Sequence, residues 1–166
     1  MSRVMIYIDN SNLFNTVKQK YPGKKIDYQR LVAFLTEGRE LADVKIYGSE
    51  KNPPLAEQSN FYKFLRKCGY LVTILPLKVS GGRYEEKGVD MALGMDMLMD
   101  GFKEHFDCAI LVSGDRDYAK LIDRVRRECG WTVEIAFFEF GLSQELRMSA
   151  QKYINLTEHL NEIIRT

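Results

Sequence analysis

Five carboxylates in three short segments are the residues of this chain best suited to chemistry. They are Asp9, Asp90, Asp96, Asp115 and Asp117. Two of the three segments directly follow apolar runs that are typical of buried strands. In an open α/β sheet, ligands bind at the carboxyl ends of the strands. Carboxylates gathered there repel one another unless a cation or a proton lies between them, so the segments indicate a hard divalent metal and chemistry on phosphate esters.

The elements that must position these carboxylates alternate between strand and helix along the whole chain. Strands are expected at Val4–Ile8, Val44–Tyr47, Leu71–Leu77, Ala109–Ser113 and Thr132–Phe138, with a short strand at Tyr153–Asn155. Helices are expected from Ser11 or Asn12 to Lys20, at Tyr28–Thr36, from Asn52-Pro53-Pro54 to Lys67, at Val89–Phe102, Tyr118–Glu128 and Gln144–Met148, and from Thr157. The segment Lys78–Lys87 is expected as a polar loop or hairpin. This alternation predicts an α/β fold with a mainly parallel sheet covered on both faces, as a single domain over residues 1–166.

Composition sets modest limits on function. The 166 residues carry a net charge of +1, with 45% hydrophobic and 28% charged residues, which is ordinary for a globular domain. The charge does not mark a strongly basic nucleic-acid binder and does not exclude one. The cysteines Cys68, Cys108 and Cys129 form no metal-binding spacing and are expected as free thiols in a reducing cytosol. No signal peptide and no apolar run of ~20 residues is present, so we expect a cytoplasmic protein without a membrane partner.

Each acidic segment also has a purely structural explanation. Asp9 is followed by Asn10, Ser11 and Asn12, and any of the four can cap a helix. Four polar residues in succession exceed the need of one cap, so we expect Asn12 to hold the loop of Asp9 by hydrogen bonds. The Asp-x-Asp pair after the fourth strand can likewise cap a helix. Taken alone, that pair leaves a cap and a metal ligand equally open.

Helical phase separates the carboxylates of the segment Val89–Phe102. Asp96 is rotated by about 120° from Asp90 on a helix of 3.6 residues per turn, which favours a supporting role for Asp96. Asp100 is expected to be a solvated helix residue. The apolar positions Met91, Met95, Leu98 and Phe102 follow helical spacing and are expected to pack in the core.

Together these motifs resemble the NYN family of the PIN-like nucleases, and its LabA-like bacterial branch in particular. The matching pieces are Ile8-Asp9 with Asn12, Lys87-Gly88-Val89-Asp90 with Asp96, and Ser113-Gly114-Asp115-Arg116-Asp117-Tyr118. The resemblance spans essentially the whole chain. Near the C-terminus, Gln151 stands where the family often has an aspartate, which is a peripheral departure from the pattern.

The resemblance implies a PIN-like three-layer α/β/α sandwich and a ribonuclease that depends on Mg²⁺ or Mn²⁺. It assigns metal and catalytic roles to Asp9, Asp90, Asp115 and Asp117, with Asn12, Asp96 and Ser113 in support. An endonuclease is favoured over an exonuclease, the partner is RNA, and nothing indicates an oligomer.

Substrate contacts are expected beside the acidic motifs. Lys87, Arg116 and Arg83 are candidates for binding the RNA backbone, although each is equally well explained as a solvated or ion-paired charge. In the hairpin, Lys78 and Tyr84 add a phosphate contact and a stacking surface, and a plain solvated hairpin is the competing interpretation.

Three other functions remain open from the sequence. One is an RNA-binding or regulatory module with little or no turnover. Another is a phosphohydrolase that forms an aspartyl-phosphate, although its D-x-D pattern is missing because Asn10-Ser11 follow Asp9. The third is a DNA nuclease of related fold.

Overall fold

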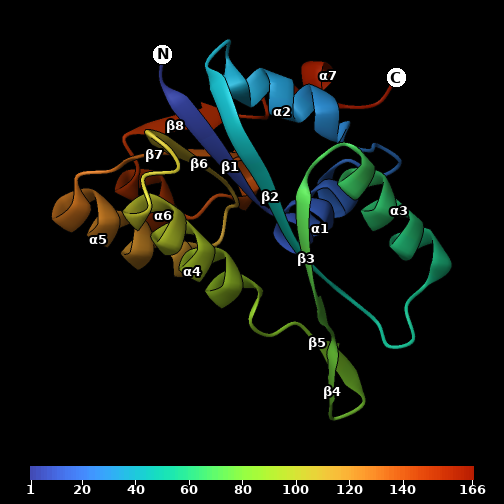
Figure 1. The fold of residues 1–166 in the computed structure, drawn as a ribbon. Helices are drawn as coiled ribbons and strands as arrows, with labels where there is room; N and C mark the ends of the chain where they lie inside the picture. The colour runs from blue at the N-terminus through green and yellow to red at the C-terminus, as the bar shows by residue number, and fades with distance from the viewer.

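A computed structural model describes all of residues 1–166 and shows an α/β fold in three layers (Figure 1). The strands are β1 (Arg3–Asp9), β2 (Glu40–Glu50), β3 (Leu71–Pro76), β4 (Lys78–Ser80), β5 (Arg83–Glu85), β6 (Cys108–Val112), β7 (Thr132–Phe137) and β8 (Lys152–Asn155). The α-helices are α1 (Asn10–Lys20), α2 (Tyr28–Thr36), α3 (Ala56–Lys67), α4 (Val89–Phe102), α5 (Ala119–Cys129), α6 (Gln144–Ser149) and α7 (Leu160–Ile163). Short 3-10 turns lie at Arg116–Tyr118 and Glu139–Gly141. The fold class expected from the sequence is confirmed.

Six strands form one sheet in the order β3-β2-β1-β6-β7-β8, and every neighbouring pair in it is parallel. The chain builds the sheet outward from β1 through β2 to β3, and then returns to place β6 on the other side of β1. The strand order therefore reverses between β1 and β6, which is the position where open α/β sheets bind ligands. The strands β4 and β5 form a separate antiparallel hairpin.

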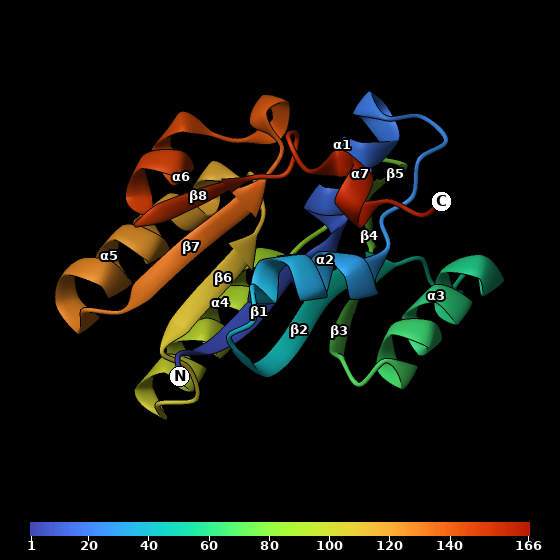
Figure 2. The same ribbon diagram turned by 90° about the horizontal axis from the view of Figure 1, so that it is seen from above.

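Two apolar cores fill the spaces between the sheet and its helices. On one face, α1, α2, α3 and α7 cover the sheet; on the other, α4, α5 and α6 do so (Figure 2). Strand β6 illustrates this covering of both faces, because all five of its residues are buried. A strand covered on both faces has no side chain that can reach water, so it reads as a continuous apolar run.

The burial of α4 differs from the expectation for its methionines. Val89, Leu93 and Met97 face the core, whereas Met91 is 66% exposed and Met95 is 56% exposed. The expected core stripe was therefore wrong. Leu98 is half-buried. Four large apolar side chains of α4 are exposed to solvent: Met91, Met95, Met99 and Phe102. A helix that carries apolar residues on every face offers little contrast from which the sequence alone can choose the buried side.

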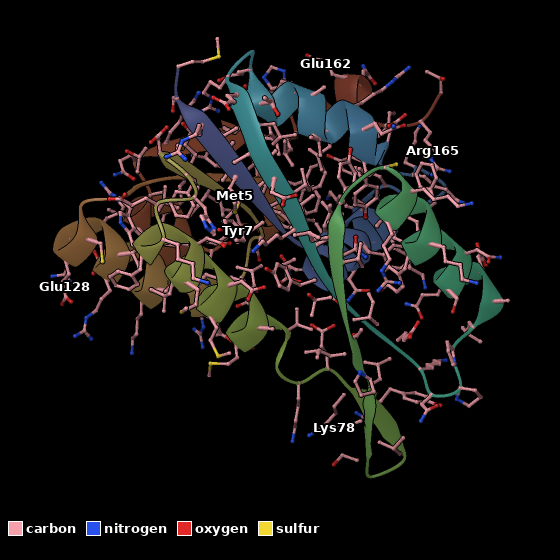
Figure 3. All side chains as sticks on the ribbon, in the orientation of Figure 1. Met5, Tyr7, Lys78, Glu128, Glu162 and Arg165 are labelled. Atoms are coloured by element: carbon pink, nitrogen blue, oxygen red, sulfur yellow. The ribbon has the colours of Figure 1, made fainter.

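Asp100 also differs from its expectation, because it is 5% exposed rather than solvated. Its carboxylate accepts hydrogen bonds from the Lys45 ammonium at 2.8 Å and from the Tyr7 hydroxyl at 2.8 Å. The His105 ring contacts it at 3.1 Å. Although burial opposes ionisation, these hydrogen bonds lower the pKa of Asp100 below its ordinary value. Asp100 thus ties α4 to β1 and β2; Tyr7 marks this region in Figure 3.

Candidate metal centre

The carboxylates of the three sequence segments meet at one pocket of about 150 Å³. Five acidic side chains line it: Asp9, Glu86, Asp90, Asp115 and Asp117. They come from the end of β1, the loop before α4, the start of α4 and the loop after β6. The pocket therefore lies at the carboxyl edge of the sheet, at the point where the strand order reverses.

Asp9 is the most buried of these carboxylates, at 5% exposure. It caps α1 by accepting a hydrogen bond from the Asn12 N–H at 3.2 Å, and it accepts a second from the Tyr118 hydroxyl at 3.0 Å. Burial raises the pKa of Asp9 to about 6, and the hydrogen bonds from Asn12 and Tyr118 only partly offset that rise. The cap and the pocket are thus two roles of one residue, and a cation would offset the cost of its buried charge.

Asp115 and Asp117 follow β6 in a tight turn. The Asp115 carboxylate accepts a hydrogen bond from the Asp117 N–H at 2.9 Å and so caps the short helix Arg116–Tyr118. Asp115 is half-buried and Asp117 is exposed. Both side chains line the pocket, so here too the cap and the candidate ligand are the same residue.

Asn12 and Ser113 brace this turn against the start of α1. The Asn12 side-chain oxygen accepts hydrogen bonds from the Gly114 N–H at 2.8 Å and from the Ser113 hydroxyl at 3.2 Å. The Ser113 hydroxyl in turn accepts from the Asp115 N–H at 3.2 Å. Asn12 therefore connects the start of α1, next to Asp9, to the loop of Asp115.

Asp90 and Asp96 lie on different sides of α4. Asp90 is in the first turn of the helix and lines the pocket, preceded by Gly88 in the left-handed conformation at φ +90°. Asp96 is not among the pocket residues; it accepts a hydrogen bond from the Tyr47 hydroxyl at 2.6 Å. Asp96 thus fastens α4 to β2 outside the pocket.

Glu86 is a pocket residue that sequence reasoning missed. The Ser49 hydroxyl at the end of β2 donates a hydrogen bond to its carboxylate at 2.6 Å. The signal was present as the acidic pair Glu85-Glu86 directly before Lys87-Gly88-Val89-Asp90. It went unused because Glu86 belongs to a loop whose path the sequence does not define.

The basic candidates lie at the surface without ion pairs. Lys87 and Arg116 are exposed, and neither has a carboxylate within 4.0 Å. Arg83 is likewise exposed and unpaired on β5. Gln151, at the position of the family's aspartate, contacts the backbone of Trp131 and Val133 at the start of β7. That departure therefore lies at the opposite edge of the sheet from the pocket.

The chemistry of the donor set fits a hard divalent cation. The charged donors of the pocket are all carboxylates, with no histidine or cysteine, and oxygen ligands suit Mg²⁺ and Mn²⁺. No three acidic, histidine or cysteine side chains already converge on a common ion position. The carboxylates therefore surround the space of a site without forming a closed coordination shell.

Fold and pocket together define a class: an α/β protein with an acidic, oxygen-lined site where the order of parallel strands reverses. The family model of the NYN domain matches residues 3–157, so the chain belongs to the NYN domain family, whose fold is PIN-like. No curated protein matches. A crystal structure of a protein of unknown function from Vibrio parahaemolyticus RIMD 2210633 is similar, with a TM-score of 0.83 and 23% identity, covering 99% of this chain and 96% of that one. This likeness shows the fold alone. None of the helices is long and apolar enough to cross a membrane.

Proposed function

We propose that this protein is a metal-dependent ribonuclease that hydrolyses internal phosphodiester bonds of RNA. The observation that carries the proposal is the convergence of Asp9, Asp90, Asp115 and Asp117 on one pocket in a chain of the NYN family. Asp9 and Asp117 are 108 positions apart in sequence. A cytoplasmic location and the LabA-like branch stay predictions within this proposal.

In this proposal, Asp9, Asp90 and Asp115 hold Mg²⁺ or Mn²⁺, and Asp117 joins them. Glu86 is a further carboxylate within reach of the same space. A bound divalent ion supplies the positive charge that lets a phosphodiester approach and makes a water nucleophilic at neutral pH. Without the ion, the same carboxylates would repel the phosphate.

The remaining residues of the site position these groups and the substrate. The Tyr118 hydroxyl orients Asp9, while Asn12 holds the loops of Asp9 and Asp115 together. Lys87 and Arg116 are unpaired cations adjacent in sequence to pocket residues, so they are available for phosphate oxygens. No cysteine or histidine lines the pocket, which favours water over a cysteine or histidine side chain as the nucleophile.

The competing function is an RNA-binding or regulatory module with little turnover. Its support is that no three carboxylates converge on one ion position. Both functions predict RNA binding, but only the nuclease predicts cleavage that depends on the pocket carboxylates.

The test is cleavage of labelled single-stranded RNA, structured RNA and DNA in Mn²⁺, Mg²⁺ or EDTA. We expect metal-dependent cleavage of RNA, including a circular RNA that has no ends, and a loss of at least about 100-fold for Asp9→Asn and Asp115→Asn, in the range for removing one electrostatic group. Asp123→Asn is the matched control, because the Asp123 side chain is half-exposed on α5, lies outside the pocket and accepts a hydrogen bond from Arg127.

Metal binding gives a second readout that does not require turnover. Mn²⁺ should raise the melting temperature of the wild type and of Asp123→Asn, and should leave that of Asp9→Asn unchanged. RNA binding without cleavage in either metal would favour the regulatory module. Cleavage of DNA alone would replace the ribonuclease with a DNA nuclease.

A further inference from the structure

The β4–β5 hairpin extends from the body of the protein and contributes nothing to either core. Every residue from Lys78 to Gly88 is exposed, and the hairpin stands clear of the helices at the end of β3 (Figures 1 and 3). Val79 pairs with Tyr84 across the two strands, so both project on the same side. Val79 is 69% exposed and Tyr84 is 52% exposed. Folding leaves this apolar pair uncovered.

Lys51 holds a positive charge against the ring of Tyr84. Its ammonium lies 4.8 Å from the ring centroid, and it has no carboxylate partner within 4.0 Å. Lys51 follows β2, whereas Tyr84 is on β5, so two separate elements contribute to this pair. An aromatic ring beside an unpaired cation is the combination that binds a base and a phosphate of a single strand.

A second pocket, of about 240 Å³, borders the same lysine. Its lining comes from the end of β2, the loop after it and β3: Glu50, Lys51, Asn52, Pro54, Ile74 and Pro76. The prolines and Ile74 offer apolar walls, and Asn52 offers amide hydrogen bonds. Because Glu50 and Lys51 both line the pocket and their formal charges cancel, an uncharged base suits it better than a phosphate group.

One short segment connects this pocket to the acidic pocket. Ser49 donates a hydrogen bond to Glu86 of the acidic pocket at 2.6 Å, while Glu50 and Lys51 line the second pocket. The Glu50 carbonyl accepts from the Leu77 N–H at 2.8 Å, which anchors the strand that leads into the hairpin. Two residues of extended chain span roughly 7 Å. Ser49, which contacts the acidic pocket through Glu86, and Lys51, which lines the second pocket, therefore lie about one nucleotide length apart along the strand.

We propose that Tyr84, Lys51 and the second pocket form a subsite for one unpaired nucleotide next to the scissile phosphate. The base enters the pocket beside Tyr84, and the Lys51 ammonium contacts the adjoining phosphate. The substrate is then single-stranded RNA, because a base within a duplex has both faces covered by its neighbours. This inference rests on the proposed ribonuclease function and identifies its class of substrate.

Binding of a fluorescein-labelled single-stranded RNA of about 12 nucleotides tests the subsite by fluorescence anisotropy. All variants carry Asp115→Asn, which prevents cleavage in the proposed mechanism. Tyr84→Ala should raise Kd about 10-fold, as for the loss of one stacked base, and Tyr84→Phe should restore binding because it keeps the ring. Lys51→Ala should raise Kd and reduce the slope of log K against log salt by about 0.7.

A matched control exists elsewhere on the surface. Lys20 lies over the ring of Phe140 at 5.3 Å in a second exposed cation–aromatic pair, and neither residue lines either pocket. Lys20→Ala should leave Kd and its salt dependence unchanged. Double-stranded RNA should bind more weakly than the single strand, and Tyr84→Ala should not change its Kd.

The subsite is refuted if Tyr84→Ala binds single-stranded RNA within twofold of its parent, or if Lys20→Ala weakens binding as much as Lys51→Ala. Equal loss of duplex binding in Tyr84→Ala would also refute it. These results do not depend on cleavage. If the wild type cuts RNA but Tyr84→Ala does not weaken RNA binding, the proposed function stands and the subsite does not. If Tyr84→Ala weakens RNA binding but the wild type never cuts RNA, the subsite stands as a binding site and the proposed nuclease function does not.

Discussion

Asp9 shows how a single residue serves both the fold and the candidate site. It caps α1 through the Asn12 N–H, and it faces the pocket with a hydrogen bond from Tyr118. A cap at the surface would satisfy the helix equally well, yet this carboxylate is buried and its pKa is raised to about 6 by that burial. The position is costly for a charge, which is the condition under which a cation contributes most to stability.

Asp100 is also a buried carboxylate, but its hydrogen-bond partners lower its pKa, whereas burial raises the pKa of Asp9. We expect Asp100→Asn to reduce the free energy of unfolding by about 2–3 kcal/mol at pH 7, since hydrogen bonds to charged groups contribute that much and Lys45 would lose its partner. The folded-state pKa lies below the unfolded one, so the stabilisation is present above about pH 4 and is lost as the pH falls through the lowered pKa.

Urea unfolding from pH 7 down to pH 2 measures this effect, with Asp107→Asn as the control. Asp107 pairs with Arg3 at the surface, where an ion pair contributes little. The difference in the free energy of unfolding between wild type and Asp100→Asn should decrease as the pH falls below about 4. A gap that is independent of pH would show that the packing of Asp100, and not its charge, stabilises α4.

At the scale of the element, α4 presents apolar side chains both to the core and to solvent. We expect Met97→Ala to lower the free energy of unfolding by about 2–5 kcal/mol, the range for a truncated buried side chain, because Met97 is fully buried. Met95→Ala, two positions earlier and 56% exposed, should change it by less than about 0.5 kcal/mol.

Chemical denaturation of the two variants side by side measures this difference. The pair is matched in residue type, in substitution and in helix, so helix propensity cancels. Equal destabilisation by both would mean that the exposed face of α4 is covered in solution, for example by a second copy of the chain.

At the scale of the whole molecule, the site depends on loops that the sheet brings together at its carboxyl edge. Gly114, beside Asp115, is one such contact: a Cβ built on it would lie 1.9 Å from the carbonyl oxygen of Gly141. The Ser143 N–H also donates to the Gly114 carbonyl at 3.0 Å. The loops after β6 and β7 are therefore packed backbone against backbone, with no space for a methyl group.

Gly114→Ala should consequently displace the turn that carries Asp115 and Asp117. We expect the variant to lose the rise in melting temperature that Mn²⁺ gives the wild type, while far-ultraviolet circular dichroism still shows the α/β fold. Gly94→Ala is the control, because its nearest contact is the flexible end of Leu121 at 3.3 Å. A normal response of Gly114→Ala to Mn²⁺ would contradict the idea that this packing positions the carboxylates.

The sequence predicted best those helices and strands whose ends are marked by local patterns of capping and apolar residues. The helix Tyr28–Thr36 matches its predicted bounds because a cap at Asp27 and apolar residues at helical spacing define it locally. The strand expected at Val44–Tyr47 extends over Glu40–Glu50, because the residues on either side of Val44–Tyr47 are paired by neighbouring strands although they carry no continuous apolar pattern of their own. Met95 and Asp100 were assigned to the wrong environments, because an apolar surface and a buried ion pair both contradict ordinary periodicity.

The sequence by itself determined the order of strands and helices, the family and the acidic residues that are candidates for chemistry. These follow from patterns within a few neighbouring residues. Only the tertiary structure decided that Glu86 joins the pocket, that Asp96 fastens α4 to β2, and that Lys51 meets Tyr84. Each of those contacts joins elements far apart in the chain, and their meeting depends on sheet order and loop path, for which no local pattern exists.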